Sequence, residues 1–293
     1  MANIAAMTVA SIAARELLGD AAWAGASTTT IVIGSAVGTS VLAWLMVRST
    51  RRLGLAMGLM LAMAGGLISA WAIATGTFVV LLAGTTLLGF GSASTQLARY
   101  AAADMAGPDQ RAQAIGLVVW AGTVGAVLGP NLAPWAASVS SDLGAAELAG
   151  PFLAAAVVLA LASGLLFLLL RPDPYELAHE SSRIEPGDAV SEPMWRIMRR
   201  PRVAMAVIAL VTGQVVMIGI MTMTPLHMDD HGHGLAAVGL VISAHTLGMF
   251  ALSPISGRIA ARVGPVAAVL AAAGVLASSA ALAAVAPPDG LVL

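Results

Sequence analysis

The sequence predicts an all-α polytopic membrane protein, and three observations support this fold class. The composition is 59% apolar and only 10% charged, with a mean hydropathy of +0.90, which lies outside the range of soluble globular domains. Apolar stretches long enough to cross a bilayer recur along the whole chain. The arginines also gather on one side of the topology that these stretches define. A disordered chain is excluded, because disorder requires low hydrophobicity and high net charge.

Each predicted helix is an apolar run bounded by a short polar or charged turn. A helix of about 17 to 25 residues spans the hydrocarbon core of a bilayer. Nine such runs occur, and they cover residues 2–19, 26–47, 53–74, 78–101, 112–137, 150–170, 203–226, 234–256 and 265–286. We therefore expect nine transmembrane helices.

The arginines predict the orientation of these helices. Basic residues in short loops are retained on the cytoplasmic side of a membrane. If the second helix ends inside, every arginine except Arg15 lies on the cytoplasmic side. We therefore expect an integral protein of the bacterial plasma membrane with a cytoplasmic amino terminus.

One long hydrophilic connection divides the chain. Residues 171–202 contain Pro and a mixture of arginines and carboxylates, a composition typical of a surface linker. The connection follows six helices, which is where a six-plus-six transporter changes halves. The expected organisation is a six-helix bundle over 1–170, a cytoplasmic linker over 171–202 and a partial bundle of three helices over 203–293.

An arginine-rich motif follows the second helix of each predicted half. The first copy contains Arg48, Arg51 and Arg52, and the second contains Gly257, Arg258, Arg262 and Gly264. Both copies resemble the loop signature G-x-L-A-D-R-x-G-R-R of the major facilitator superfamily. The resemblance implies a cytoplasmic latch in which small residues allow close helix approach and charges pair with helix ends. The signature's Asp is replaced by Val47 and Ala261.

A second family motif lies in the fifth predicted helix. Gly116, Gly125, Gly129 and Pro130 reproduce the spacing G-x8-G-x3-G-P, which is associated with the antiporters of this superfamily. Small residues let helices pack closely in lipid, and a proline kinks a membrane helix. General small-residue packing is the alternative explanation. The resemblance favours an antiporter that couples efflux to protons.

The fourth predicted helix departs from the family pattern. Its segment Gly89–Ala93 resembles the end of the motif R-x-x-Q-G-x-G-A, but Thr85 and Leu88 stand at the Arg and Gln positions. In relatives that have it, the Arg is implicated in proton transfer. Proton coupling is therefore a hypothesis for this chain.

Four polar side chains are candidates for a substrate or proton pathway. His245 lies near the middle of the eighth predicted helix and can titrate near neutral pH. Gln214 lies near the middle of the seventh helix, and Thr95 and Gln96 lie nearer the cytoplasmic end of the fourth. Hydrogen bonding between packed helices is the alternative role for each of them.

The connection between the seventh and eighth predicted helices is rich in metal-ligand types. It contains His227, Asp229, Asp230, His231 and His233, and imidazole with carboxylate can bind Zn²⁺ or Ni²⁺. A polar exterior turn or a pH-sensitive gate is favoured, because no ligand spacing of fixed geometry is visible. We expect neither a metal nor a cofactor.

The sequence as a whole favours a secondary active permease that works by alternating access. The run from Thr224 to Arg258 resembles an actinobacterial-type branch of the superfamily. Because the family has twelve helices, we expect a truncated chain. Proton-coupled efflux of a small molecule is the leading function, and metabolite uptake or a non-transporting scaffold or sensor are the alternatives. The expected partners are lipid, a small-molecule substrate and protons, but not nucleic acid.

An enzyme is not expected. No H-E-x-x-H motif and no pair of in-helix aspartates occurs, and Ser92, which might pair with His245, lacks the G-x-S-G turn of intramembrane serine proteases.

Overall fold

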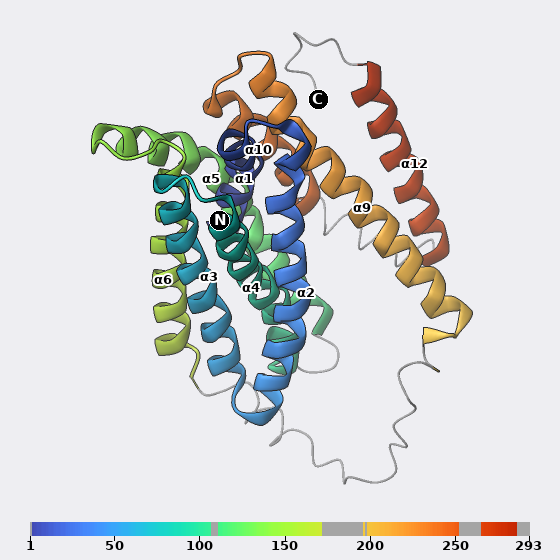
Figure 1. The fold of residues 1–293 in the computed structure, drawn as a ribbon. Helices are drawn as coiled ribbons and strands as arrows, with labels where there is room; N and C mark the ends of the chain where they lie inside the picture. Colours follow the sequence, from blue (N-terminus) through green and yellow to red (C-terminus); the bar gives the residue numbers. More distant parts are fainter. Residues whose placement is uncertain (1, 107–110, 172–195, 197, 252–264, 286–293) are drawn as a thin grey trace.

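The computed structural model describes residues 2–106, 111–171, 196, 198–251 and 265–285. Within these ranges the chain forms nine α-helices and one short 3-10 helix, with no strand, which confirms the all-α fold class (Figure 1). The α-helices are α1 (Ala2–Leu18), α2 (Ala24–Arg48), α3 (Arg51–Ala74), α4 (Phe78–Asp104), α5 (Arg111–Asp142), α6 (Ala149–Leu169), α9 (Pro201–Asp230), α10 (Leu235–Ala251) and α12 (Pro265–Val285). The 3-10 helix η1 (Ala21–Trp23) precedes α2.

Every apolar run predicted from the sequence coincides with one of these helices. By length and composition alone, five of the described helical segments are apolar enough to cross a membrane, namely Gly25–Arg48, Arg51–Ala74, Phe78–Asp104, Ala149–Leu169 and Val203–Asp230. Shorter apolar helical segments in the described part of the chain are Ala114–Gly125, Leu235–Ala251 and Val269–Leu282. The regular recurrence of apolar runs therefore located the helices correctly.

The predicted end of the seventh helix was wrong. The sequence predicts that this helix ends at residue 226, whereas α9 continues to Asp230. The turn follows only at His231 and Gly232, whose φ is 76°. Proline removes one backbone donor but leaves the rest of a membrane helix intact when neighbouring helices support it. His227, Asp229 and Asp230 are consequently helical residues.

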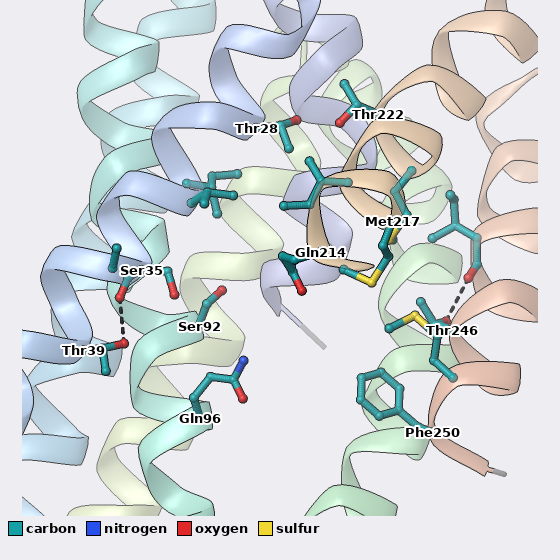
Figure 2. Close-up of a pocket in the computed structure, with 17 residues that line it drawn as sticks. Thr28, Ser35, Thr39, Ser92, Gln96, Gln214, Met217, Thr222, Thr246 and Phe250 are labelled. Atoms are coloured by element: carbon teal, nitrogen blue, oxygen red, sulfur yellow. Dashed lines mark hydrogen bonds between the residues drawn. The ribbon is translucent and has the colours of Figure 1, made fainter. Parts of the chain in front are cut away.

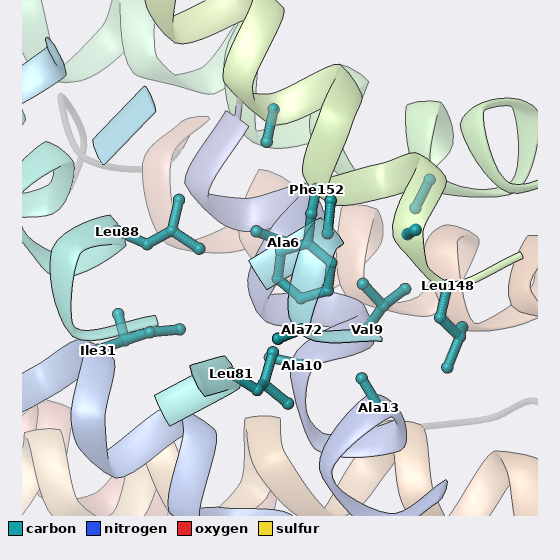
Figure 3. Close-up of a cluster of buried hydrophobic side chains, with 14 of the residues drawn as sticks. Ala6, Val9, Ala10, Ala13, Ile31, Ala72, Leu81, Leu88, Leu148 and Phe152 are labelled. Carbon is teal, nitrogen blue, oxygen red and sulfur yellow. The ribbon is translucent and has the colours of Figure 1, made fainter. Parts of the chain in front are cut away.

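The first six α-helices pack together around a shared core. α4 contacts α2 and α3, α6 packs against α3, and α1 touches α2, α4, α5 and α6. Phe152 of α6 and Leu81 of α4 are fully buried beside Ala6, Val9 and Ala10 of α1 (Figure 3). Because many core side chains are alanine, the helix backbones approach one another closely.

Glycines bring α2 and α4 into direct backbone contact. A Cβ atom built on Gly89 would lie 2.6 Å from the backbone nitrogen of Ser35 and would overlap the Ile31 carbonyl. A Cβ on Gly34 of α2 would overlap the carbonyl of Thr86. No side chain fits between these helices at either position, so glycine is required there by packing.

We expect Gly89→Ala to destabilise the protein by about 1–3 kcal/mol, the usual cost of overpacking a tight interface. The measurement is the Tm of the purified protein in detergent, which should fall. Gly164→Ala in α6 is the matched control, because nothing lies within 4 Å of a Cβ at Gly164. Its Tm should stay the same or rise, since alanine favours helix over glycine. Equal Tm values for the two variants would contradict this interpretation of the α2–α4 contact.

The later helices lie on one side of this six-helix group. α10 packs mainly against α5, and α9 touches α1 and α2 (Figure 1). α12 contacts α9, and its described side chains are largely exposed. The α9–α10 pair therefore faces α2 and α4 across a space that holds the candidate site.

Candidate functional site

A cavity of about 450 Å³ lies between α2, α4, α9 and α10 (Figure 2). α2 and α4 form one wall, and α9 and α10 form the opposite wall. The volume lies within the range of about 300–1,000 Å³ that is typical of small-molecule sites. Residues separated by more than one hundred positions in the sequence thus line one space.

The wall of the cavity is neutral. None of the described residues that line it carries a charge. The polar lining residues are two amides and several hydroxyls, namely Gln96, Gln214, Thr28, Ser35, Thr39, Ser92, Thr222 and Thr246. The remaining lining residues are aliphatic side chains, three methionines and one phenylalanine. The lining suits an uncharged ligand with both apolar and hydrogen-bonding groups.

Two of the four predicted pathway residues line this cavity. Gln96 of α4 and Gln214 of α9 lie on opposite walls, and Figure 2 shows both side chains directed into the space between these helices. Thr95 is not among the lining residues, and its hydroxyl donates to the Gly91 carbonyl at 2.9 Å within α4. His245 is also absent from the lining and is exposed on α10.

Thr85, at the position of the family's arginine, is buried in the helix packing. It is 0% exposed, and its hydroxyl lies 2.7 Å from the hydroxyl of Thr30 in α2 and donates to the Leu81 carbonyl at 2.9 Å. Leu88, at the glutamine position, is 1% exposed. These two residues join α4 to its neighbours and do not line the cavity.

Ion pairs close the gap between α1 and α9 at one end of the cavity. The guanidinium group of Arg15 donates to the carboxylates of both Asp229 and Asp230. The Arg15 side chain is 23% exposed, against 33% for Asp229 and 57% for Asp230. A guanidinium that is paired with two carboxylates and partly shielded from water binds more strongly than a fully exposed pair.

Burial along α9 shows that its contact with the bundle is confined to this end. Among its described residues, none from Val203 to Met221 is buried, whereas Thr222, Leu226 and Met228 are 8%, 5% and 5% exposed. The helix therefore meets the six-helix group beside the ion pairs and diverges from it toward Pro201 (Figure 1).

The candidate metal ligands do not form a cluster in the structure. Within the described residues, no group of three or more His, Asp or Glu side chains is placed to hold a metal ion. Asp229 and Asp230 pair with Arg15, and His227 and His231 stack with ring centroids 4.3 Å apart. His233 lies in the turn before α10.

The first copy of the loop motif carries an ion pair at the other end of the bundle. Arg51, the first residue of α3, pairs with Asp104, the last residue of α4, at 2.9 Å. Arg48 lies over the Trp44 ring at 4.4 Å, and Arg52 lies over the Phe167 ring at 4.7 Å. The second copy, Gly257, Arg258, Arg262 and Gly264, lies outside the described residues.

The fifth-helix motif lies within α5, next to a residue that contacts α10. Gly125 and Gly129 are buried, Pro130 lies inside α5, and Gly116 has open space where a Cβ would be. The next residue, Asn131, donates to the Ser243 hydroxyl of α10 at 2.8 Å. This hydrogen bond and the tight α5–α10 contact join the six-helix group to the later helices.

Sequence reasoning missed the ion pairs of Arg15 and the link between Asn131 and Ser243. A signal for the first was present, because Arg15 is the one arginine on its side of the predicted topology and two adjacent aspartates share that side. No sequence signal identified Ser243 as a partner of Asn131, because their contact depends on how α10 is rotated against α5.

Comparison with known proteins gives one family for the whole chain. Residues 1–293 match the Major Facilitator Superfamily. The chain is 35% identical over 295 residues to the uncharacterized MFS-type transporter YdeG of Bacillus subtilis, covering 99% of this chain and 68% of the relative. It is 31% identical over 296 residues to the uncharacterized MFS-type transporter YddS of the same organism, covering 99% and 67%.

A third relative has a named substrate. The riboflavin transporter RfnT of Brucella anthropi is 35% identical over 236 residues, which cover 79% of this chain and 56% of that protein. No solved structure matches the chain at a comparable level.

Proposed function

Because the chain belongs to the major facilitator superfamily, a family of membrane transporters, we propose that it moves a neutral small molecule across the bacterial plasma membrane by alternating access. The observation that carries this proposal is the uncharged cavity between α2, α4, α9 and α10. Cavities between the two halves of a transporter, near the middle of the bilayer, are where such proteins bind substrate.

The neutral lining of the cavity supports an uncharged substrate. Moving an ion from water into a site of low dielectric constant costs several kcal/mol unless an opposite charge or many hydrogen bonds compensate it. The described lining offers amides, hydroxyls and apolar surface, but no counter-charge. We therefore propose a substrate that is uncharged at neutral pH.

The proposed movement is a rocking of two bundles, 1–170 and 203–293, joined by the linker 171–202. The ion pairs of Arg15 with Asp229 and Asp230 support closure at one end of the cavity. The lack of burial along the first two thirds of α9 supports an opening at the other end. With the amino terminus in the cytoplasm, as the arginines predict, the closed end faces outward and the open end faces the cytoplasm.

We propose that protons drive efflux, with His245 as the group that takes up and releases the proton. The fifth-helix glycines support this assignment by their resemblance to the antiporter motif. His245 is an ionisable residue near the middle of α10, one of the four helices that form the cavity. It is next to Thr246, which lines the cavity, so its protonation can influence the helix that contacts substrate.

The test is flux of neutral compounds in proteoliposomes, with and without an imposed pH gradient. We expect gradient-dependent movement of an uncharged compound by the unchanged protein, and His245→Ala should remove the gradient dependence while downhill flux continues. Flux in His245→Ala that still follows the pH gradient would show that His245 is not the coupling group. Absence of flux for every neutral compound would instead favour a scaffold or sensor.

Uptake of a flavin-like metabolite is the second candidate function. It is favoured by one observation, the 35% identity to a protein named as a riboflavin transporter. Riboflavin is uncharged at neutral pH and therefore suits the lining of the cavity. Accumulation of riboflavin by intact cells that express the protein would favour uptake, whereas accelerated loss of preloaded compound would favour efflux.

A further inference from the structure

The geometry of the cavity points to a specific class of substrate. We propose that Gln96 and Gln214 recognise the lactam or imide edge of a neutral aromatic heterocycle and so determine which molecules enter. This inference rests on the proposed function, because it assigns the ligand of the same cavity.

The two glutamines are the amide groups that the cavity offers to a ligand. They come from opposite walls, α4 and α9, and both side chains are directed into the space between them (Figure 2). Within the described part of the chain, neither side chain forms a hydrogen bond with another residue. Both residues are exposed and line the cavity, so their amides are accessible to a ligand.

Hydroxyls that line the cavity are partly used by the protein itself. Thr39 donates to the Ser35 carbonyl at 2.8 Å, and Thr246 donates to the Ile242 carbonyl at 2.8 Å. These hydroxyls can still accept a hydrogen bond, but their proton is engaged. Each glutamine amide, in contrast, presents a donor and an acceptor in one plane.

A planar group with an adjacent donor and acceptor is complementary to another group of the same kind. A lactam or imide edge, with C=O beside N–H, can form two parallel hydrogen bonds with one glutamine amide. A ligand that lacks the N–H leaves the glutamine amide oxygen without a hydrogen-bond partner inside the closed cavity. Because an unpaired buried polar group costs free energy, a polar site of this kind rejects close analogues.

The apolar part of the lining suits a flat ring. Met217 and Met221 of α9 and Met249 and Phe250 of α10 contribute thioethers and an aromatic face to one wall. Thioether sulfur contacts aromatic rings favourably, and methionine adapts to the outline of its ligand. Phenylalanine can stack on such a ring in an offset or edge-on arrangement. The cavity volume of about 450 Å³ accommodates a molecule of two or three fused rings.

The experiment measures binding of two fluorescent probes to the purified full-length protein. Alloxazine is a neutral tricyclic dione with free N–H groups, and 1,3-dimethylalloxazine has the same rings and carbonyls without these donors. We expect the unchanged protein to bind alloxazine at least about tenfold more tightly, a difference equivalent to one good hydrogen bond. Gln96→Leu and Gln214→Leu should each bring the ratio of the two Kd values toward one. Thr95→Val, next to Gln96 but outside the cavity lining, is the matched control and should keep the ratio.

The ratio of the two Kd values remains informative when a variant folds poorly, because a smaller folded fraction affects the binding of both probes equally. Equal binding of the two probes by the unchanged protein, or binding of neither, would overturn the inference. A ratio that survives in both glutamine variants would overturn it too. If the proposed transport function is wrong but the ligand assignment is right, selective and glutamine-dependent binding will occur without flux in proteoliposomes.

Discussion

Replacing Arg15 by glutamine is expected to open the α1–α9 end of the cavity. The substitution removes the charged partner of Asp229 and Asp230 and leaves two adjacent carboxylates that repel each other. Hydrogen bonds to charged groups contribute about 1.5–3 kcal/mol when shielded and about 0.2–1 kcal/mol when exposed. Because the Arg15 and Asp229 side chains are only 23% and 33% exposed, we expect a loss of about 1–2 kcal/mol, which shifts the closed-to-open ratio about 5- to 30-fold.

The absence of cysteine from the chain makes this shift measurable. A Thr28→Cys substitution places a single thiol at a cavity-lining position near the start of α2, on the side of the ion pairs. Its rate of reaction with a membrane-impermeant maleimide reports access from the side to which the reagent is added. We expect Arg15→Gln to raise the rate in intact cells and to lower it in inside-out vesicles.

Two variants test whether the ion pair itself is responsible. Asp142→Asn removes an exposed carboxylate at the same end of the bundle and should leave the labelling rate unchanged. The exchange Arg15→Asp with Asp229→Arg restores opposite charges across the gap and should return the rate toward that of the parent protein. Unchanged labelling in Arg15→Gln would show that packing of Leu226 and Met228, rather than charge, closes this end.

Filling the cavity is expected to abolish transport without unfolding the protein. Ala36 of α2 lines the cavity and its small side chain is exposed to it. In Ala36→Trp, the indole occupies space that the substrate needs, and it replaces no buried core atom. We expect flux in proteoliposomes to fall at least about tenfold, which corresponds to a loss of about 1.4 kcal/mol of binding.

The control for this variant is Ala160→Trp on α6. Ala160 is exposed on a helix that contributes nothing to the cavity lining, so a tryptophan there points away from the proposed pathway. Both variants should migrate as the parent protein does in gel filtration, and only Ala36→Trp should lose flux. Normal flux in Ala36→Trp would contradict the assignment of the cavity as the transport pathway.

The helices could be predicted from sequence because membrane spanning is a local property. The helix α3 contains 24 residues with no charged group after its first turn, and its length matches the bilayer. The error at α9 has a tertiary cause. Polar residues such as His227 and Asp229 look like a loop in isolation, but contacts of Leu226 and Met228 and pairing with Arg15 keep them helical.

The candidate site was only partly accessible to the same reasoning. Gln96 and Gln214 were found because uncharged polar groups are rare in apolar helices. Thr95 satisfied the same criterion, and His245 was selected as an ionisable residue within a membrane helix, yet the structure leaves both outside the cavity lining. The difference is one of helical phase. Neighbouring residues on a helix point about 100° apart, and only the packed partner determines which of two adjacent side chains faces the shared space.

The sequence by itself predicted a membrane protein, the number and approximate positions of the described helices, and the family. These properties depend on composition and on runs of adjacent residues. Tertiary structure alone decided which helices enclose the cavity, that Arg15 reaches the carboxylates of Asp229 and Asp230, and that Asn131 meets Ser243. Each of these pairs joins residues more than one hundred positions apart, and their contact depends on the rotation and separation of packed helices, which no local pattern encodes.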